Sequence, residues 1–419
     1  MSKVSIIGAY NTAFGSFVRR DRESGQVTDV QSLQDLVVEA GRGALADARV
    51  EAGEVDAVYV GSCAPGLFAN QEHVSAVAGE IDEALRFKPM TRCEAACASG
   101  SVAIYDAVYA IEAGRVRTAL VVGVEKMNLL DTRGVTHALA TCSHWPTEGA
   151  RGATFPGLFA TLAKAYQRRW EIDEDGLRRM FATVAALGYR NGARNPLAHF
   201  GPGGPADKQK LFTAEAILAL PGEGKGGNPL IADPLRLHDC SLISDGAAAV
   251  LLTTTAGAKA RGSRRSVELA GIGHSVERMP IASRAAPHEL VAGKDAVRKA
   301  FAEAGIAVDD VDFAEVHDCF TINQILCTEA LGLSSDGRGG HDYLAGRFGP
   351  DDRCPVNLSG GLKAKGHPVG ATGVSMHALA YKQLVGEPVG VPASNPEIGV
   401  TFNVGGSGVT NCVSVLRRS

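Results

Sequence analysis

The sequence predicts an α/β protein built from two similar halves. Apolar runs of strand length alternate with amphipathic helical patterns along most of its 419 residues. Residues 44–60 also align without a gap on residues 300–316, at an offset of 300 − 44 = 256, and each copy reads as a helix, an acidic turn and a strand. Chance self-similarity is the alternative for alignments this short. A duplicated sheet covered by helices explains both observations.

Each expected element has its own pattern of apolar residues. Apolar residues three or four positions apart predict helices that contain Leu33, Leu36, Ala40, Ala44 and Ala48 in the first half and Val297, Ala300, Phe301 and Ala304 in the second. Apolar runs predict strands at residues 4–8, 119–124, 247–252, 400–404 and 409–416. With 45% hydrophobic residues, the chain can bury a substantial core.

A second internal sequence similarity lies at two predicted helix starts. Ala98 to Gly100 corresponds to Ala371 to Gly373 at an offset of 371 − 98 = 273. This offset exceeds the first one, so the second half carries a net insertion between the two elements. The glycine-rich residues 334–350 are the expected place for it.

The alternation of strands and helices breaks between the halves. Residues 128–228 contain both tryptophans and a basic run, with loops predicted at 201–205 and 221–229. We therefore divide the chain into a first half (1–127 and 229–265), an inserted loop domain (128–228) and a second half (266–419). The insertion is expected to be a lid or substrate-binding region, and the alternative is a solvated excursion that covers apolar surface.

Composition narrows the class of protein. The formal net charge is −4 with scattered lysine and arginine, which argues against nucleic acid as a partner. The start of the chain lacks the pattern of a signal peptide, and no apolar run reaches the roughly 18 residues of a membrane span. Nine cysteines without dense clustering indicate reduced thiols. A cytoplasmic protein without a membrane span is therefore expected.

Cys97 is the first of four places that offer reactive groups. It directly precedes the helix start at 98–100, where small residues let backbone N–H groups approach a ligand and the positive helix end favours a thiolate. A buried small apolar residue is the alternative interpretation of a lone cysteine. Cys93 lies one helical turn earlier, but no second Cys or His pair stands at ligand spacing, so no metal site is predicted.

The second place is His317 to Phe320, directly after the predicted strand that ends at Val316. Catalytic groups collect at strand ends in α/β sheets, and His317 and Cys319 would present an imidazole and a thiol there. The same His-Asp-Cys tripeptide recurs at residues 238–240, so core packing is the alternative for either copy.

The other two places are glycine-rich. His367 is followed by a proline and preceded by glycines, so its imidazole can be held on a rigid loop, although a packed loop histidine is the alternative. Asn403 to Gly408 reads as a strand that ends in glycines. Asn403 and Gly405 are candidates for binding an oxyanion or substrate there, since free N–H groups can receive an oxyanion, while a plain glycine-rich turn is the simpler interpretation.

Together these four segments resemble the thiolase family, and specifically its sterol-carrier-protein and archaeal-like branch. Cys97 occupies the acylated position, His367 lies in the family's Gly-His-Pro motif, and the His-Asp-Cys-Phe sequence at 317–320 matches the motif of this branch. One departure from ordinary thiolases supports the assignment. The C-terminal Cys-x-Gly motif is replaced by Asn403 to Gly405, and in this branch Cys319 takes over the acid and base task.

The resemblance implies a five-layered αβαβα fold and the interconversion of a 3-oxoacyl-CoA plus CoA with two acyl-CoA molecules. His367 would deprotonate Cys97, Cys319 would move the α-proton, and His317 would join His367 in stabilising the enolate oxygen. The backbone N–H groups of Cys97 and Gly405 would form the other oxyanion hole. No metal or redox cofactor is expected, and coenzyme A takes part as a substrate.

The resemblance also implies partners and alternatives. Ser241 resembles a family position near the pantetheine of CoA, and a homodimer or homotetramer is expected. One alternative is acyl transfer or retro-aldol cleavage of a CoA-linked substrate with a small OB-fold or zinc-bearing partner. Another is a non-catalytic protein that binds acyl-CoA or lipid on the same scaffold. Retention of Cys97, Cys319 and His367 favours the thiolase reaction.

Overall fold

The computed structural model describes residues 3–21, 23–262 and 265–419, and within them nine strands form one large mixed sheet. Their order across the sheet is β11-β12-β13-β10-β1-β9-β6-β4-β5. Their bounds are β1 (Val4–Asn11), β4 (Ala57–Gly61), β5 (Met90–Cys93), β6 (Thr118–Glu125), β9 (Gly246–Thr254), β10 (Val267–Val276), β11 (Phe313–Val316), β12 (Ile398–Gly405) and β13 (Thr410–Arg418). Two small hairpins pair β2 (Val18–Arg20) with β3 (Val27–Asp29) and β7 (Leu230–Ala232) with β8 (Leu235–Arg236).

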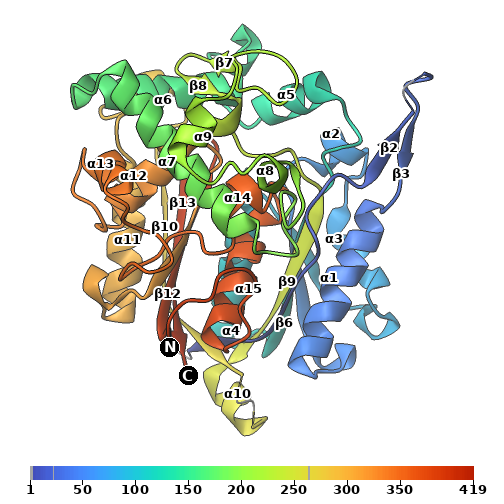
Figure 1. The fold of residues 1–419 in the computed structure, drawn as a ribbon. Coiled ribbons are helices and arrows are strands. Elements are labelled where there is room, and N and C mark those ends of the chain that lie inside the picture. Colours follow the sequence, from blue (N-terminus) through green and yellow to red (C-terminus); the bar gives the residue numbers. More distant parts are fainter. Residues whose placement is uncertain (1–2, 22, 263–264) are drawn as a thin grey trace.

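The helices lie on both faces of this sheet and beyond its upper edge in Figure 1. They are α1 (Leu33–Ala48), α2 (Pro65–Ala69), α3 (Val74–Val77), α4 (Ser99–Glu112), α5 (Thr132–Ala140), α6 (Phe155–Arg169), α7 (Glu174–Gly192), α8 (Pro205–Lys208), α9 (Ala214–Leu218), α10 (Thr255–Ala260), α11 (Val291–Ala304), α12 (Thr321–Ala330), α13 (Gly339–Leu344), α14 (Gly361–Ala364) and α15 (Thr372–Leu384). Ser32 caps the first of them through a capping box with Asp35.

The layers follow the order predicted for the fold class. Helices α4 and α15 lie in the centre, between the strands β6 and β9 of one half and β12 and β13 of the other (Figure 1). Helix α1 covers the outer face of the first half, and α11 covers that of the second. Both β layers belong to one continuous sheet, because β1 pairs with β9 along its length and also with β10 over Val4–Ile6. The α/β fold with α, β, α, β and α layers is confirmed.

The predicted duplication is present in the structure. Helices α1 and α11 end at Ala48 and Ala304, and strands β4 and β11 begin at Ala57 and Phe313, both pairs offset by 256 (304 − 48 and 313 − 57). A 3-10 turn lies between helix and strand in each half. Helices α4 and α15 begin 372 − 99 = 273 residues apart, as the second internal similarity requires. The strands predicted from apolar runs correspond to β1, β6, β9, β12 and β13.

The central helices α4 and α15 touch at their first turns because glycines leave room. A Cβ atom on Gly373 would lie 2.3 Å from the backbone nitrogen of Ser101, and one on Gly100 would lie 2.8 Å from the carbonyl oxygen of Gly370. Real side chains do not approach backbone atoms this closely, so alanine at either glycine would push the helices apart. The two helix starts, one from each half, therefore meet backbone to backbone.

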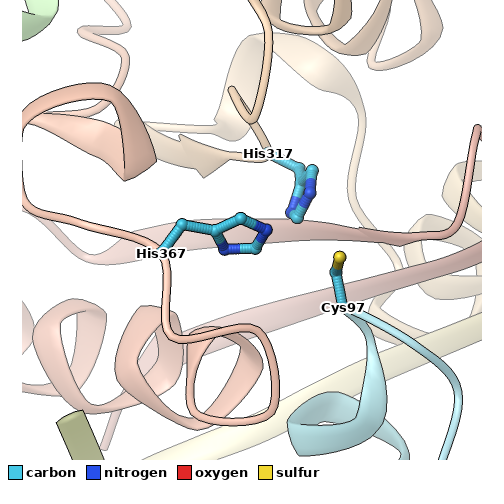
Figure 2. A group of neighbouring side chains, drawn as sticks. All are labelled: Cys97, His317 and His367. Carbon is cyan, nitrogen blue, oxygen red and sulfur yellow. The ribbon is translucent and has the colours of Figure 1, made fainter. Parts of the chain in front are cut away.

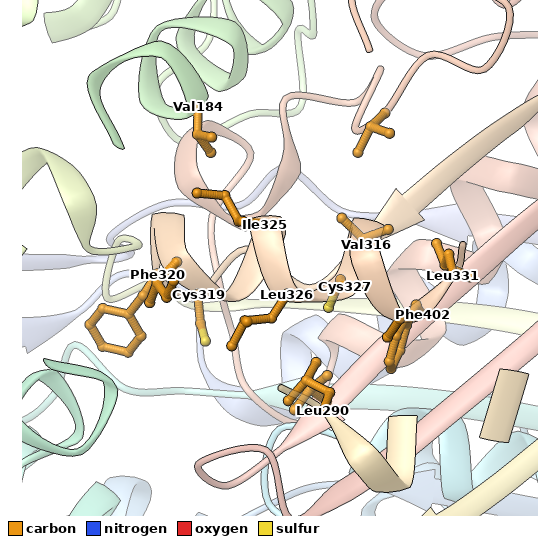
Figure 3. Packing of buried hydrophobic residues seen from close by; sticks show 14 of the residues in the cluster. Val184, Leu290, Val316, Cys319, Phe320, Ile325, Leu326, Cys327, Leu331 and Phe402 are labelled. Atoms are coloured by element: carbon orange, nitrogen blue, oxygen red, sulfur yellow. The ribbon is translucent and has the colours of Figure 1, made fainter. Parts of the chain in front are cut away.

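Residues 128–228 form helices α5 to α9, with loops where glycine and proline predict them. The apolar faces of α6 and α7 pack on the second half of the chain, and Figure 3 shows Val184 of α7 facing Ile325 of α12. The ring of Phe159 stacks on Phe320, with 4.5 Å between ring centroids. These helices are thus anchored next to the His-Asp-Cys-Phe segment. The domain boundaries and the role of the insertion as a lid stay predictions.

Helix α7 has 19 residues and comes nearest to the length of a membrane span. Its first two turns contain Glu174, Asp175, Arg178 and Arg179, so it is strongly polar at that end. Across the residues that the structure describes, no helix is both long and apolar enough to cross a membrane.

Candidate active site

Cys97 lies on a tight turn between strand β5 and helix α4. Ala96 just before it adopts a left-handed conformation with φ of 52°. The side chain of Ser99 holds the turn, because its Oγ accepts the N–H of Ala95 at 2.9 Å and donates to the carbonyl of Ala96 at 2.6 Å. Such a turn, with a non-glycine residue at positive φ, fixes the direction of the next side chain. Cys97 is held in one place, with 7% of its surface exposed.

His367 is held by the first turn of helix α15. Its Nδ1 lies 2.7 Å from the hydroxyl oxygen of Thr372, and that hydroxyl donates its hydrogen to the carbonyl of Pro368 at 3.0 Å. Because the hydroxyl has one hydrogen, it accepts from Nδ1–H of the imidazole. The Nε2 atom of His367 then carries a free lone pair, which is the form that a general base needs.

His317 is held in the opposite tautomer by Asn403. The amide nitrogen of Asn403 donates to the carbonyl of Cys97 at 3.1 Å and lies 3.0 Å from Nδ1 of His317, while its oxygen accepts from Ser101 at 2.9 Å. These partners fix which end of the amide is nitrogen. Nδ1 of His317 is therefore an acceptor, and Nε2 carries the hydrogen.

The Nε2 atom of His317 is a buried donor without an acceptor among the described residues. An unpaired buried polar group is costly, so its presence needs an explanation. The position suits an oxygen that gains negative charge during a reaction, since that oxygen would accept the hydrogen bond.

The three side chains converge from both halves of the chain. One ligand atom from each of Cys97, His317 and His367 lies within 4.8 Å of the others, and Figure 2 shows the sulfur facing both rings. The two imidazole rings meet edge to face with centroids 5.1 Å apart. All three residues are buried. The predicted nucleophile and base therefore share one site.

A thiol and two imidazoles are also the ligand types of a zinc or copper ion. A histidine that binds a metal normally donates its other ring N–H to an acceptor. In this site Nδ1 of His317 faces the amide N–H of Asn403, which leaves Nε2 protonated and unable to bind a metal ion. The arrangement fits acid and base chemistry better than metal binding.

Burial determines the charges in the site. It raises the pKa of Cys97, and the hydrogen bond that the sulfur accepts from the N–H of Gly406 opposes this shift only in part. Burial and the nearby Lys365 lower the pKa of His367 to about 3. Thiol and imidazole are both neutral near pH 7, so the helix end does not produce a standing thiolate. Cys97 needs His367 to remove its proton during attack.

Cys319 lies where strand β11 leads into helix α12, two residues after His317. Figure 3 shows its sulfur next to Leu326 in the apolar core of the second half. Burial raises the pKa of Cys319, and the nearby Cys97 raises it further. The sulfur of Cys319 is not part of the group of three ligand atoms that lie within 4.8 Å of one another.

Two other predicted residues lie around the site. A Cβ atom on Gly405 would lie 2.2 Å from the carbonyl of Ala95, so the end of β12 packs directly on the turn of Cys97. The N–H that reaches the sulfur belongs to Gly406, one residue further on. Ser241 donates its N–H to the carbonyl of Cys319 at 2.8 Å, which places it beside the other thiol.

The second copy of the tripeptide does not join the site. The sulfur of Cys240 lies 3.4 Å from the carbonyl of Arg236, and its own carbonyl accepts from Lys363. Nδ1 of His238 bonds to the hydroxyl of Tyr189 at 2.6 Å. These contacts are packing contacts, as expected from core packing, the alternative interpretation for this copy.

Sequence reasoning missed the residues that position the site. Thr372 orients His367. The only clue to it in the sequence was its position within residues 371–373, which repeat residues 98–100. Asp318 accepts the N–H groups of Leu362 and Lys363 at 2.6 and 3.1 Å, which ties the His317 segment to the loop that leads to His367. Nothing local in the sequence predicts either contact.

Comparisons with known proteins show which family the chain resembles. The family model for the thiolase N-terminal domain matches residues 4–203, and the thiolase C-terminal domain-like model matches residues 273–418. The chain is 37% identical to the acetyl-CoA acetyltransferase of Methanothermobacter thermautotrophicus over 418 residues, with both chains covered in full. It is 26% identical to sterol carrier protein 2 of Homo sapiens, with 97% of this chain and 70% of that protein covered.

A solved structure shares the fold at lower sequence identity. The Ltp2-ChsH2(DUF35) aldolase superposes with a TM-score of 0.78 and 19% identity, covering 99% of this chain and 98% of that chain. The two family models together account for most of the chain, and the full-length relative at 37% identity agrees with them. The chain therefore belongs to the thiolase family.

Proposed function

We propose that this chain is a thiolase of the sterol-carrier-protein and archaeal-like branch. It is an acyltransferase that interconverts a 3-oxoacyl-CoA plus CoA with acetyl-CoA plus an acyl-CoA through an acyl-cysteine. The convergence of Cys97, His317 and His367 in a buried site carries this proposal. The full-length similarity to a protein named acetyl-CoA acetyltransferase supports the reaction type.

The first half-reaction loads the acyl group. Nε2 of His367 takes the proton of Cys97 as the sulfur attacks the thioester carbonyl carbon. The N–H groups of Cys97 and of the Gly405–Gly406 turn stabilise the negative oxygen. When the intermediate collapses, the bond to the CoA sulfur breaks and His367 returns the proton to that sulfur. The acyl group is then bound to Cys97.

The second half-reaction forms or breaks the carbon bond. Cys319 reacts as the thiolate and removes a proton from the α-carbon of acetyl-CoA, while Nε2–H of His317 donates to the enolate oxygen. His367 contributes a second donor whenever its Nε2 is protonated. The α-carbon attacks the acyl carbonyl carbon, and the sulfur of Cys97 leaves as a thiolate, which takes up the proton that Cys319 now carries. Thiolysis follows the same steps in reverse, with Cys319 returning the proton to the α-carbon.

The proposal also covers the substrates, the oligomeric state and the partners of the protein. CoA and acyl-CoA are the substrates, Ser241 lies near the pantetheine, and no cofactor takes part. We propose a cytoplasmic homodimer or homotetramer. A smaller OB-fold or zinc-bearing partner belongs to the alternative of retro-aldol or acyl-transfer chemistry. Copurification of such a subunit, or activity only in its presence, would favour that alternative.

A substrate panel tests the proposed reaction. The purified chain is incubated with CoA and 3-oxoacyl-CoA thioesters of increasing length, and loss of the 3-oxoacyl thioester is followed. We expect CoA-dependent cleavage that releases acetyl-CoA, with one range of chain lengths preferred. Folded protein that cleaves no member of the panel would contradict the thiolase reaction and favour a binding protein.

The role of Cys319 can be separated from that of Cys97. Cys319→Ala is expected to slow exchange of the α-protons of acetyl-CoA into deuterated water by about 10²- to 10⁴-fold, because general-base catalysis contributes this much. Acylation of Cys97 by acetyl-CoA should remain. Proton exchange is measured by NMR and acylation by mass spectrometry.

Cys240→Ala is the matched control, since Cys240 stands in the same tripeptide but outside the site. Its turnover should stay near that of the wild type. Normal proton exchange in Cys319→Ala would show that another group is the base, and a large loss in Cys240→Ala would show that the wrong copy was chosen.

A further inference from the structure

Two cysteines that the proposed reaction does not use lie in contact beside the site. The sulfur atoms of Cys63 and Cys142 are 3.3 Å apart, although the residues are 79 positions apart in the chain. A disulfide bond is about 2.05 Å long, so the two atoms need to approach by only about 1.3 Å. Cys63 follows strand β4 in the first half, and Cys142 follows helix α5 in the insertion.

The surroundings hold both backbones in place. Cys63 donates its N–H to Glu125 at 2.7 Å, and its carbonyl accepts from Arg92 at 2.6 Å. Cys142 donates its N–H to the carbonyl of Leu139 at 2.8 Å. The contact between the sulfurs therefore joins two fixed segments.

The pair lines the hollow that leads to the turn of Cys97. This hollow has a volume of about 420 Å³, and Cys63, Cys142, Ala95 and Ala96 form part of its wall. Cys142 is half-buried, whereas only 4% of the surface of Cys63 is exposed. A small oxidant in the hollow would therefore contact the more exposed Cys142 first, and the sulfur of Cys63 lies in contact with that of Cys142.

We infer that Cys63 and Cys142 form a reversible disulfide when the enzyme meets a peroxide. This adds a redox-sensitive dithiol beside the acylation site and goes beyond the proposed thiolase function. The Cys142 sulfur attacks one peroxide oxygen, and the O–O bond breaks to give a sulfenic acid and one water. The Cys63 sulfur then attacks the sulfenic sulfur, and its proton leaves with the hydroxyl as a second water. Two thiols are oxidised and one peroxide is reduced.

The order of the two thiols follows from their exposure. Cys142 is half-buried and faces the hollow, whereas Cys63 is buried behind it. Contact with the Cys142 sulfur, together with burial, also raises the pKa of Cys63, so that Cys142 is the thiol that reacts first. A dithiol reductant reverses the bond by exchange.

Mass spectrometry of the full-length enzyme tests the inference. The protein is treated with hydrogen peroxide, free thiols are blocked with N-ethylmaleimide, and the unreduced digest is searched for crosslinked peptides. We expect a Cys63–Cys142 crosslink that dithiothreitol removes. Cys63→Ser and Cys142→Ser should lack it. Cys354→Ser, which replaces a buried cysteine outside the hollow, should retain it.

Two further measurements test the disulfide without relying on catalytic activity. Cys97→Ala should still form the crosslink, because the pair does not need the nucleophile. Oxidised wild-type enzyme should unfold at a higher temperature than reduced enzyme, since the bond closes a long loop in the unfolded chain. Cys142→Ser should show no such rise. Two results would overturn the inference. One is a dominant crosslink between Cys97 and Cys142. The other is that N-ethylmaleimide still labels both Cys63 and Cys142 after treatment with peroxide.

Discussion

Cys97→Ala is expected to abolish the acyl-enzyme. Without this sulfur the two imidazoles cannot replace it, because they are held as a base and a donor, and the thiol of Cys319 is outside the group formed by Cys97, His317 and His367. Wild-type protein incubated with acetyl-CoA should gain the mass of one acetyl group per chain, and the variant should gain none. Thiolysis should fall below detection, since covalent catalysis splits the reaction into two steps that both need this sulfur.

Cys93→Ala is the control for this experiment. Cys93 is also buried and stands four residues earlier, but its thiol donates to Asp106 at 3.2 Å instead of facing the imidazoles. The control should be labelled like the wild type. Normal labelling of Cys97→Ala would assign the nucleophile to another cysteine.

His367→Ala should slow acylation by about 10²- to 10⁴-fold, the usual contribution of a general base. The effect is expected to be large because burial raises the pKa of Cys97, so that few thiolates form without the imidazole. Carbon bond formation should suffer as well, since the same ring stabilises the enolate when protonated. Rapid-quench mass spectrometry gives the acylation rate directly.

His341→Ala serves as the control, because His341 lies exposed on helix α13. Its acylation rate should not change. A circular dichroism spectrum equal to that of the wild type would show that His367→Ala is folded. If the folded variant acylates at the normal rate, a different group removes the proton of Cys97.

Much of the fold could be predicted because both halves repeat one pattern of apolar residues. The helix, turn and strand that end at Gly61 have a counterpart that ends at Val316, and the structure reproduces this correspondence. Cys97, His317 and His367 could be chosen because each stands at a strand end, a helix start or a rigid loop. The structure brings the three together, while their roles stay predictions.

The tautomers and charges of the site residues depend on contacts between residues far apart in the sequence. Asn403 was expected to bind substrate or an oxyanion, but its amide nitrogen bonds to residues 86 and 306 positions away and sets the tautomer of His317. No local pattern records such contacts. The charge of Cys97 was also beyond prediction, because a helix start favours a thiolate and only the packed structure shows that burial outweighs it.

The contact between helices α4 and α15 limits which substitutions this protein can accept. The sulfur and the imidazole meet because Gly100 and Gly373 have no side chains to separate the helices that carry them. A single methyl group at this seam would open a gap across the middle of the molecule and move the reacting atoms apart. A substitution at Gly100 or Gly373 therefore acts on both halves at once, because each glycine makes room for the backbone of the other half.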